Sequence, residues 1–146
     1  MALAPLAIDD IPQIAWTATS GGRILSLNRA WYERVGRRAP ANATPASLEK
    51  QWWAAVHRDD RARCRQALQS GATSRAGFEL ELRLLRAGGM YRWYRLFVSP
   101  FEEAQDDGAG WLGICTDIDD YKRQGQIFAF LAQAGEVLAE SLDLQA

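Results

Sequence analysis

Few residues of this 146-residue chain have the types and spacing that catalysis or metal binding requires. His57 is the only histidine, a candidate haem ligand or proton switch. Cys64 stands between Arg63 and Arg65, whose charges would lower the pKa of a reactive thiol. Cys115 is distant in the sequence, and two isolated cysteines with one histidine make a poor zinc site. The sequence therefore predicts no catalytic residue and no metal site.

The same groups have structural interpretations, which we favour. His57 lies in a predicted turn, where an imidazole hydrogen-bonds nearby backbone, and Cys64 is interpreted as a core thiol, a common place for free cysteine. Asp59 and Asp60 precede a helical pattern, where a carboxylate caps the helix. The acidic pairs within residues 102–107 lack the spacing of a glycosidase or a calcium site. A small isomerase or dehydratase would need a buried acid–base pair, and the sequence offers none.

The overall charge is nearly balanced. Lysine and arginine number 17, and aspartate and glutamate number 18, which leaves a formal net charge of -1 at pH 7. Without a basic excess, we expect no nucleic-acid partner and no contact with a membrane. No apolar run approaches the ~20 residues of a membrane span. The sequence predicts a cytoplasmic domain with reduced thiols, long enough to bury a core.

The chain begins with the pattern of a β-hairpin followed by a short helix. Two strands are expected over residues 13–17 and 23–27, joined by a glycine turn that needs positive φ. Asn28 is expected to cap a helix over residues 29–35, and Gly36 is expected to end it.

Two further helices are expected over residues 48–55 and 61–69. Their predicted boundary residues are Ser47 as the first cap, Asp59 or Asp60 as the second cap, and Gly71 as the end of the second helix. Trp52 and Trp53 are adjacent in the first of these helices, so both cannot face the core. One of them is expected at the surface, where an exposed aromatic suggests an interface.

The second half of the chain changes to a period of two. Apolar and charged residues alternate over residues 78–84, and further strands are expected over 91–101 and 111–118. The charged residues of this region are interpreted as a solvated face with cross-strand pairs: Glu79, Glu81, Arg83, Arg86, Arg92 and Arg95. From Asp119 the pattern is helical. Four of its apolar residues have the spacing of a coiled-coil seam: Ile127, Leu131, Ala134 and Leu138.

Five antiparallel strands, with helices between the second and third, give an α+β architecture. The pattern resembles a PAS domain of the sensory-box subclass found in bacterial sensor kinases, diguanylate cyclases and phosphatases. The resemblance covers roughly residues 13–123. The matching residues are Gly22, Asn28, Trp31, Gly36, Val56-His57, Asp59-Asp60, Phe78-Glu79, Glu81, Arg83, Gly89, Tyr91-Arg92-Trp93, Pro100, Trp111, Gly113, Thr116, Asp117-Ile118-Asp119 and Lys122-Arg123.

Three positions depart from the pattern of the subclass. Arg58 stands where proline is usual, Cys64 where tryptophan is common, and Gly88 where the hairpin carries an acidic residue. The change at Cys64 matters most, since a smaller side chain leaves room in the core. Flavin-adduct photoreceptors of this fold carry Gly-x-Asn-Cys-Arg, a motif that the residues around Cys64 do not match. The resemblance therefore implies neither haem nor a flavin adduct, and the cofactor stays unknown.

The resemblance implies a PAS fold with short helices on one side of the sheet and a C-terminal exit helix. It divides the chain into a lead-in (1–12), the PAS domain (13–119) and a signalling-helix linker (120–146) toward an output domain. The implied function is a sensory, signal-relay and dimerisation module of a bacterial multidomain signalling protein, without catalysis of its own. A closed-core interaction domain that binds no ligand is the alternative.

The implied sites fall into three groups. The candidate ligand-pocket residues are Trp16, Trp31, Cys64, Phe78, Leu80, Trp93 and Trp111. The predicted signal-transfer residues are Asp117, Ile118 and Asp119, at the end of the last strand. The predicted homodimer contacts are the seam residues of the exit helix, Ile127, Leu131, Ala134 and Leu138. The expected partners are a second copy, an output domain in the same polypeptide and a candidate small molecule.

Overall fold

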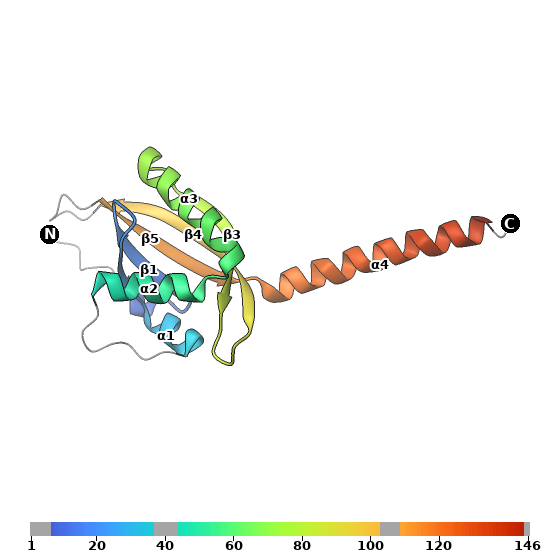
Figure 1. The fold of residues 1–146 in the computed structure, drawn as a ribbon, viewed down its shortest axis with the longest axis horizontal. Helices are drawn as coiled ribbons and strands as arrows, with labels where there is room; N and C mark the ends of the chain where they lie inside the picture. Colours follow the sequence, from blue (N-terminus) through green and yellow to red (C-terminus); the bar gives the residue numbers. More distant parts are fainter. Residues whose placement is uncertain (1–6, 37–43, 103–108, 145–146) are drawn as a thin grey trace.

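The computed structural model describes residues 7–36, 44–102 and 109–144. Its elements are η1 (Ile8–Asp10), β1 (Ile14–Thr19), β2 (Ile24–Leu27), α1 (Arg29–Val35), α2 (Pro45–Ala55), α3 (Arg58–Ser74), β3 (Phe78–Leu85), β4 (Tyr91–Glu102), β5 (Ala109–Asp117) and α4 (Asp119–Leu144). The five strands form one antiparallel sheet in the order β2-β1-β5-β4-β3. The predicted α+β architecture is therefore confirmed, with α4 extending away from the sheet (Figure 1).

Asn28 joins the hairpin, the first helix and the lead-in. Its Oδ1 accepts hydrogen bonds from the Ala15 amide at 2.9 Å and the Trp31 amide at 3.2 Å, which confirms the predicted cap of α1. Its Nδ2 donates to three carbonyls, those of Ile8, Ile11 and Gln13. The side chain is fully buried, and every one of its polar groups is used.

The boundaries of α2 and α3 differ from the predicted ones. α2 starts at Pro45 because Thr44 and Ser47 form a reciprocal capping box, so Thr44 is the cap. α3 starts at Arg58 because the Nδ1 atom of His57 accepts the Asp59 amide hydrogen at 3.1 Å. The caps predicted at Ser47 and at Asp59 or Asp60 were therefore wrong.

Gly71 lies inside α3 and does not end it. The helix continues to Ser74, and Arg75 takes the left-handed conformation that terminates it. A Cβ at Gly71 would lie 2.7 Å from the ring of Phe78. The glycine allows α3 and β3 to approach closely, and it is a packing residue rather than a stop signal.

The hydrophobic core lies between one face of the sheet and helices α1, α2 and α3 (Figure 1). Trp16, Trp31 and Trp52 are fully buried there and pack ring against ring, with centroids 5.8 Å apart for Trp16–Trp52 and 5.6 Å for Trp31–Trp52. Trp53 is only partly buried, and Arg65 lies over its ring at 4.5 Å. Of the adjacent pair, Trp52 is fully buried, whereas Trp53 is partly buried and packs against the core, so the expected surface position is met only in part.

Helix α4 is tied to the sheet by two side chains of its first turn, Asp119 and Lys122. The large apolar side chains described on α4 are exposed, among them Phe128 and Phe130, whereas Ala134 is half-buried. Among the described residues, no helix combines the length and the apolar character that crossing a bilayer requires.

Substitution of Asn28 by Ala should destabilise the domain by roughly 2–4 kcal/mol, because buried backbone groups on three segments lose their partners. Urea unfolding followed by tryptophan fluorescence measures the change. Thr44→Ala is the matched control, since it removes an exposed helix cap and should cost about 1 kcal/mol. Equal losses in the two variants would contradict the central role of Asn28.

Candidate functional site

The candidate site is the junction at which β5 becomes α4. The Asp119 amide donates to Asp117 Oδ1 at 2.9 Å, so Asp117 caps the start of the exit helix. Asp119 points back to the sheet, where its Oδ1 accepts the Trp93 amide hydrogen at 3.1 Å. The Ile118 amide donates to the Trp93 carbonyl at 2.9 Å. The three predicted signal-transfer residues therefore lie together, and two of them bind the backbone of one residue of β4.

Two arginines hold Asp117 from the side of the β3–β4 hairpin. Arg92 Nε donates to Asp117 Oδ2 at 2.8 Å, and Arg86 Nη1 lies 3.4 Å from the same oxygen. The hydrogen bond that Arg92 donates to Asp117 raises the pKa of Arg92. Arg86 also donates to the hydroxyl of Tyr94 and to the carbonyl of Arg34, at the end of α1. The cap of α4 is thus connected to the hairpin and to the first helix.

Asp119 is buried but stays ionised. Burial alone would raise its pKa, yet the hydrogen bonds from the Trp93 amide and from Arg123, with the charges of Arg123 and Arg92, bring that pKa below its ordinary value. Arg123 Nε donates to Asp119 Oδ2 at 2.6 Å, one helical turn further along α4. The carboxylate therefore links the sheet to the first two turns of the exit helix.

A second polar cluster lies on the outer face of the sheet, next to this junction. Arg95 of β4 is directly opposite Glu81 of β3 and donates to it at 3.0 Å, as the predicted cross-strand pairing requires. Lys122 of α4 binds the same carboxylate. Hydrogen bonds from Lys122 and Arg95 lower the pKa of Glu81.

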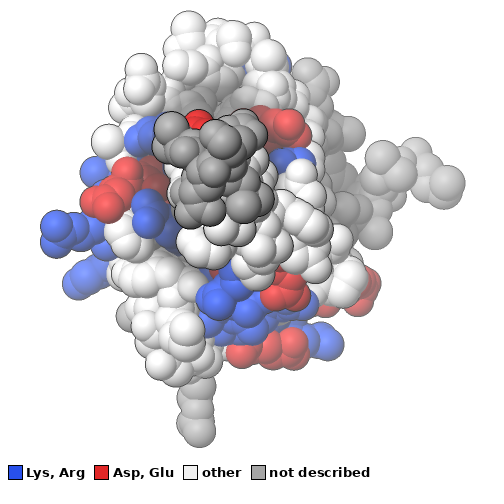
Figure 2. Space-filling view, turned by 90° about the vertical axis from the view of Figure 1, so that its right-hand side faces the viewer, with Lys and Arg blue, Asp and Glu red and all other residues white. Residues whose placement is uncertain are grey.

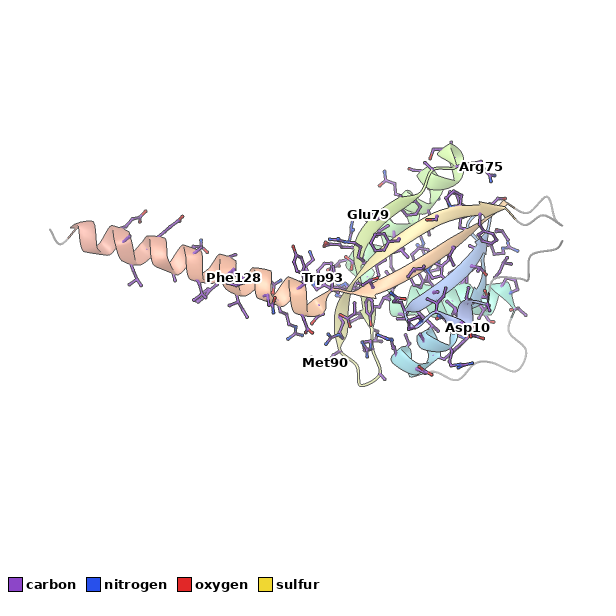
Figure 3. The ribbon with its side chains drawn as sticks, turned by 180° about the vertical axis from the view of Figure 1, so that it is seen from behind. Asp10, Arg75, Glu79, Met90, Trp93 and Phe128 are labelled. Carbon is purple, nitrogen blue, oxygen red and sulfur yellow. The ribbon has the colours of Figure 1, made fainter. Side chains whose placement is uncertain are left out.

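Trp93 lies at the centre of this outer cluster, where the sheet meets α4 (Figure 3). The guanidinium of Arg83 is 4.8 Å from the centre of its ring, and the Lys122 ammonium is 4.6 Å from it. Its neighbour Tyr94 points to the opposite side, into the core. Trp93 therefore lies on the other face of the sheet, and its assignment to the ligand pocket was wrong.

The other pocket candidates lie on the core side of the sheet. Trp16, Trp31, Cys64 and Trp111 are buried in the core, and Phe78 and Leu80 are partly buried against it. Trp111 Nε1 donates to the Ser20 carbonyl at 3.2 Å.

The indole N–H groups of Trp16, Trp31 and Trp52 have no acceptor among the described residues. Buried tryptophans usually bind a partner, so three donors without one, close together in the core, are unusual.

The two cysteines and the histidine have structural surroundings. Burial raises the pKa of Cys64 to about 12, although Arg63 and Arg65 oppose the shift. Burial also raises the pKa of Cys115. His57 caps α3, and its ring packs edge-on against Tyr91 with centroids 4.7 Å apart. Among the described residues, no cluster of three metal-ligating side chains is found.

Four partners of the junction escaped the sequence analysis: Arg83, Arg86, Arg92 and Lys122. They were interpreted as solvated charges or as part of a motif. Their roles depend on strand register, which places Tyr94 opposite Asp117 and Arg83 opposite Trp93. The alternation of the predicted strands would have indicated that Arg83 and Trp93 share a face of the sheet with Glu81. It would not have indicated that Lys122 of α4 contacts this face.

Basic and acidic side chains lie beside one another on the side of the molecule from which α4 projects (Figure 2). This face carries interspersed charges of both signs rather than a field of one sign, as expected from the ion pairs described above.

The family model for the PAS fold matches residues 24–115. The chain belongs to the PAS family. PAS domains are generally sensory, non-catalytic modules, and those of histidine kinases are among the similar proteins.

Two curated proteins illustrate the relationship. The uncharacterized protein y4lL of Sinorhizobium fredii is 30% identical over 112 residues, which are 77% of this chain and 13% of that protein. The peroxide stress-activated histidine kinase mak1 of Schizosaccharomyces pombe is 28% identical over an alignment of 120 residues, and the alignment covers 76% of this chain and 7% of that protein. The chain therefore spans a small part of the length of these relatives.

Solved structures have the same fold. A sensory box histidine kinase/response regulator from Burkholderia thailandensis superposes with a TM-score of 0.65 at 19% identity, covering 90% of this chain and 95% of that chain. The PAS domain of a protein from Colwellia psychrerythraea gives a TM-score of 0.56 at 20% identity, covering 78% of this chain and 92% of that chain.

Acidification should destabilise the domain through the carboxylates whose pKa is lowered on folding, Asp60, Glu81 and Asp119. Such groups stabilise the fold above their unfolded pKa, and this contribution is lost as the pH falls through the folded pKa. Asp119→Asn should therefore be less stable than the wild type at about pH 6, and the difference should narrow at about pH 3. Urea unfolding at both pH values is the measurement.

Asp120→Asn is the control, because its side chain is 88% exposed. It should change stability little at either pH. A difference between wild type and Asp119→Asn that is independent of pH would contradict the ionised state of Asp119.

Proposed function

We propose that this domain is the sensory, signal-relay and dimerisation module of a bacterial multidomain signalling protein. A ligand or partner would alter the packing of the core and sheet, and the junction at Asp117 and Asp119 would pass this change to α4. The helix would then act on an output domain of the same polypeptide. The observation that carries the proposal is the direct attachment of the exit helix to β4 through Asp119 and the Trp93 backbone.

The division of the chain follows the same proposal. Residues 13–119 are the sensory unit, and residues 120–146 are the linker. The lead-in, residues 1–12, contributes contacts to the unit, since Asp9 Oδ1 accepts the Arg29 amide hydrogen at 2.7 Å. The relatives are much longer than this chain, which supports a place within a larger protein.

Dimerisation is proposed through α4. The seam residues Ile127, Leu131 and Leu138 are 57%, 56% and 65% exposed, and Ala134 lies between them. A row of exposed apolar residues at heptad spacing is stabilised by a second helix of the same kind. A second copy of the chain supplies that helix, and the expected product is a homodimer.

The core is proposed to accept a small molecule. The unsatisfied indole donors of Trp16, Trp31 and Trp52 support a neutral ligand with hydrogen-bond acceptors, because no unpaired charge lines the described core. The buried carboxylates are engaged elsewhere, Asp60 with Arg83 and Asp119 with Arg123. Neither is free to act as an acid or base, which supports a non-enzymatic role.

Leu131→Glu should convert the dimer into a monomer, since it places a charge in the apolar seam. Native mass spectrometry gives the oligomeric state, and comparison with the denatured mass reveals any retained small molecule. Glu136→Gln, at an exposed position of the same helix, is the control and should stay dimeric. A wild-type monomer would contradict the dimer, and the absence of retained mass would favour the closed-core interaction domain.

Asp117→Ala should uncouple the core from α4 in the full-length parent protein while the domain stays folded. The variant removes the cap of α4 and the partner of Arg92. The activity of the output domain is measured with and without the stimulus, beside Asp120→Ala as the exposed neighbour. A response identical to the wild type would contradict the role of the junction in the relay.

A further inference from the structure

The ring of Trp93 contacts two cations that belong to different elements. Arg83 comes from β3 and Lys122 from the first turn of α4, with their charged groups 4.8 Å and 4.6 Å from the ring centre. Lys122 is held in place by its ion pair with Glu81. The arrangement holds the first turn of α4 against the outer face of the sheet, and we call Arg83, Trp93, Lys122 and Glu81 the tryptophan clamp.

The position of Arg83 is set by a buried carboxylate of α3. Asp60, only 3% exposed, accepts from the Arg83 backbone amide at 2.8 Å and from its guanidinium at 3.0 and 2.9 Å. Asp60 lies in the first turn of α3, and Cys64 of the next turn is in the core. The clamp is therefore attached to the helical layer as well as to the sheet.

The side of α4 held by the clamp is opposite to its apolar seam. At about 100° per residue, Lys122 lies roughly 150° around the helix from the mean direction of Ile127, Leu131, Ala134 and Leu138. With Lys122 against Trp93, the seam faces away from the outer face of its own sheet. Three of the four seam residues, Ile127, Leu131 and Leu138, are exposed on the projecting helix, and Ala134 is half-buried.

We infer that Trp93 is a positioning residue, whose clamp sets the direction and rotation of α4 so that the seam is presented to a second copy of the chain. The inference rests on the proposed relay function and specifies how its helix is oriented. The backbone contacts of Trp93 fix the start of α4, and its side chain fixes the rotation of the helix. Loss of the side chain leaves α4 attached but free to swing.

Distance measurement by double electron–electron resonance tests this inference on the 146-residue chain. Spin labels are placed through Met90→Cys, at the hairpin tip, and Gln133→Cys, on α4 outside the seam. Cys64 and Cys115 are 0% and 1% exposed and do not compete for the label. Dilution with unlabelled chain restricts the measurement to distances within one copy.

In the wild type, the distribution of distances should be narrow. Trp93→Leu and Lys122→Gln should each broaden it about twofold or more, because both remove the cation–π contact. Lys122→Arg should keep the distribution as narrow as in the wild type, since it keeps the positive charge that Lys122→Gln removes. Phe97→Leu is the matched control: it removes an aromatic ring from the same strand and face, 40% exposed, and should leave the width unchanged.

An unchanged width in Trp93→Leu would overturn the inference. So would equal broadening in Phe97→Leu, which would indicate general loosening of the sheet. Circular dichroism verifies that each variant is folded. Repeating the measurement in the Leu131→Glu background tests the clamp separately from the proposed dimer. The clamp acts within one copy of the chain, so the distribution of distances should stay narrow even if no dimer forms.

Discussion

The alternation of side chains along β4 is the constraint on which the site depends. Successive residues of a strand point to opposite faces of the sheet. Tyr94, Leu96 and Val98 face the helices and complete the core, whereas Trp93 and Arg95 face outward. One strand thereby supplies both part of the core and the outer surface that the first turn of the exit helix contacts. A change in the core that shifts β4 acts on both faces at once.

The charges around the junction are arranged so that each buried one is paired. Asp60 and Asp119 are buried carboxylates, and each receives hydrogen bonds from an arginine and from a backbone amide of β3 or β4. A buried charge without such partners would be costly. The sheet backbone therefore orients both carboxylates, and the carboxylates in turn orient α3 and α4. This mutual dependence makes the first turns of the two helices sensitive to the register of the same two strands.

Local patterns in the sequence predicted most of the fold. Period-two alternation identified the strands, and the cap at Asn28 followed from residue type. The caps at Thr44 and His57 were missed, and Gly71 was wrongly predicted to end α3, because these features depend on partners rather than on residue type. The partners are a capping box, an imidazole acceptor and a close contact with Phe78. Trp93 was misplaced for a similar reason. Its aromatic character suggested a place in the core. The alternation of side chains along β4 instead places it on the outer face, where it contacts Lys122 of α4.

Helix α4 carries its contacts to the sheet and its apolar seam on opposite sides. The first turn binds the sheet through Lys122 and Asp119, while Leu131 and Leu138 on the opposite side of the helix are exposed. The polar contacts are directional and define one rotation of α4 about its own axis, whereas apolar packing is non-directional and allows a wider range of angles. The domain can therefore determine which way the seam faces without taking part in the seam. A signal that alters the polar contacts would rotate the seam relative to the domain and leave the helix intact.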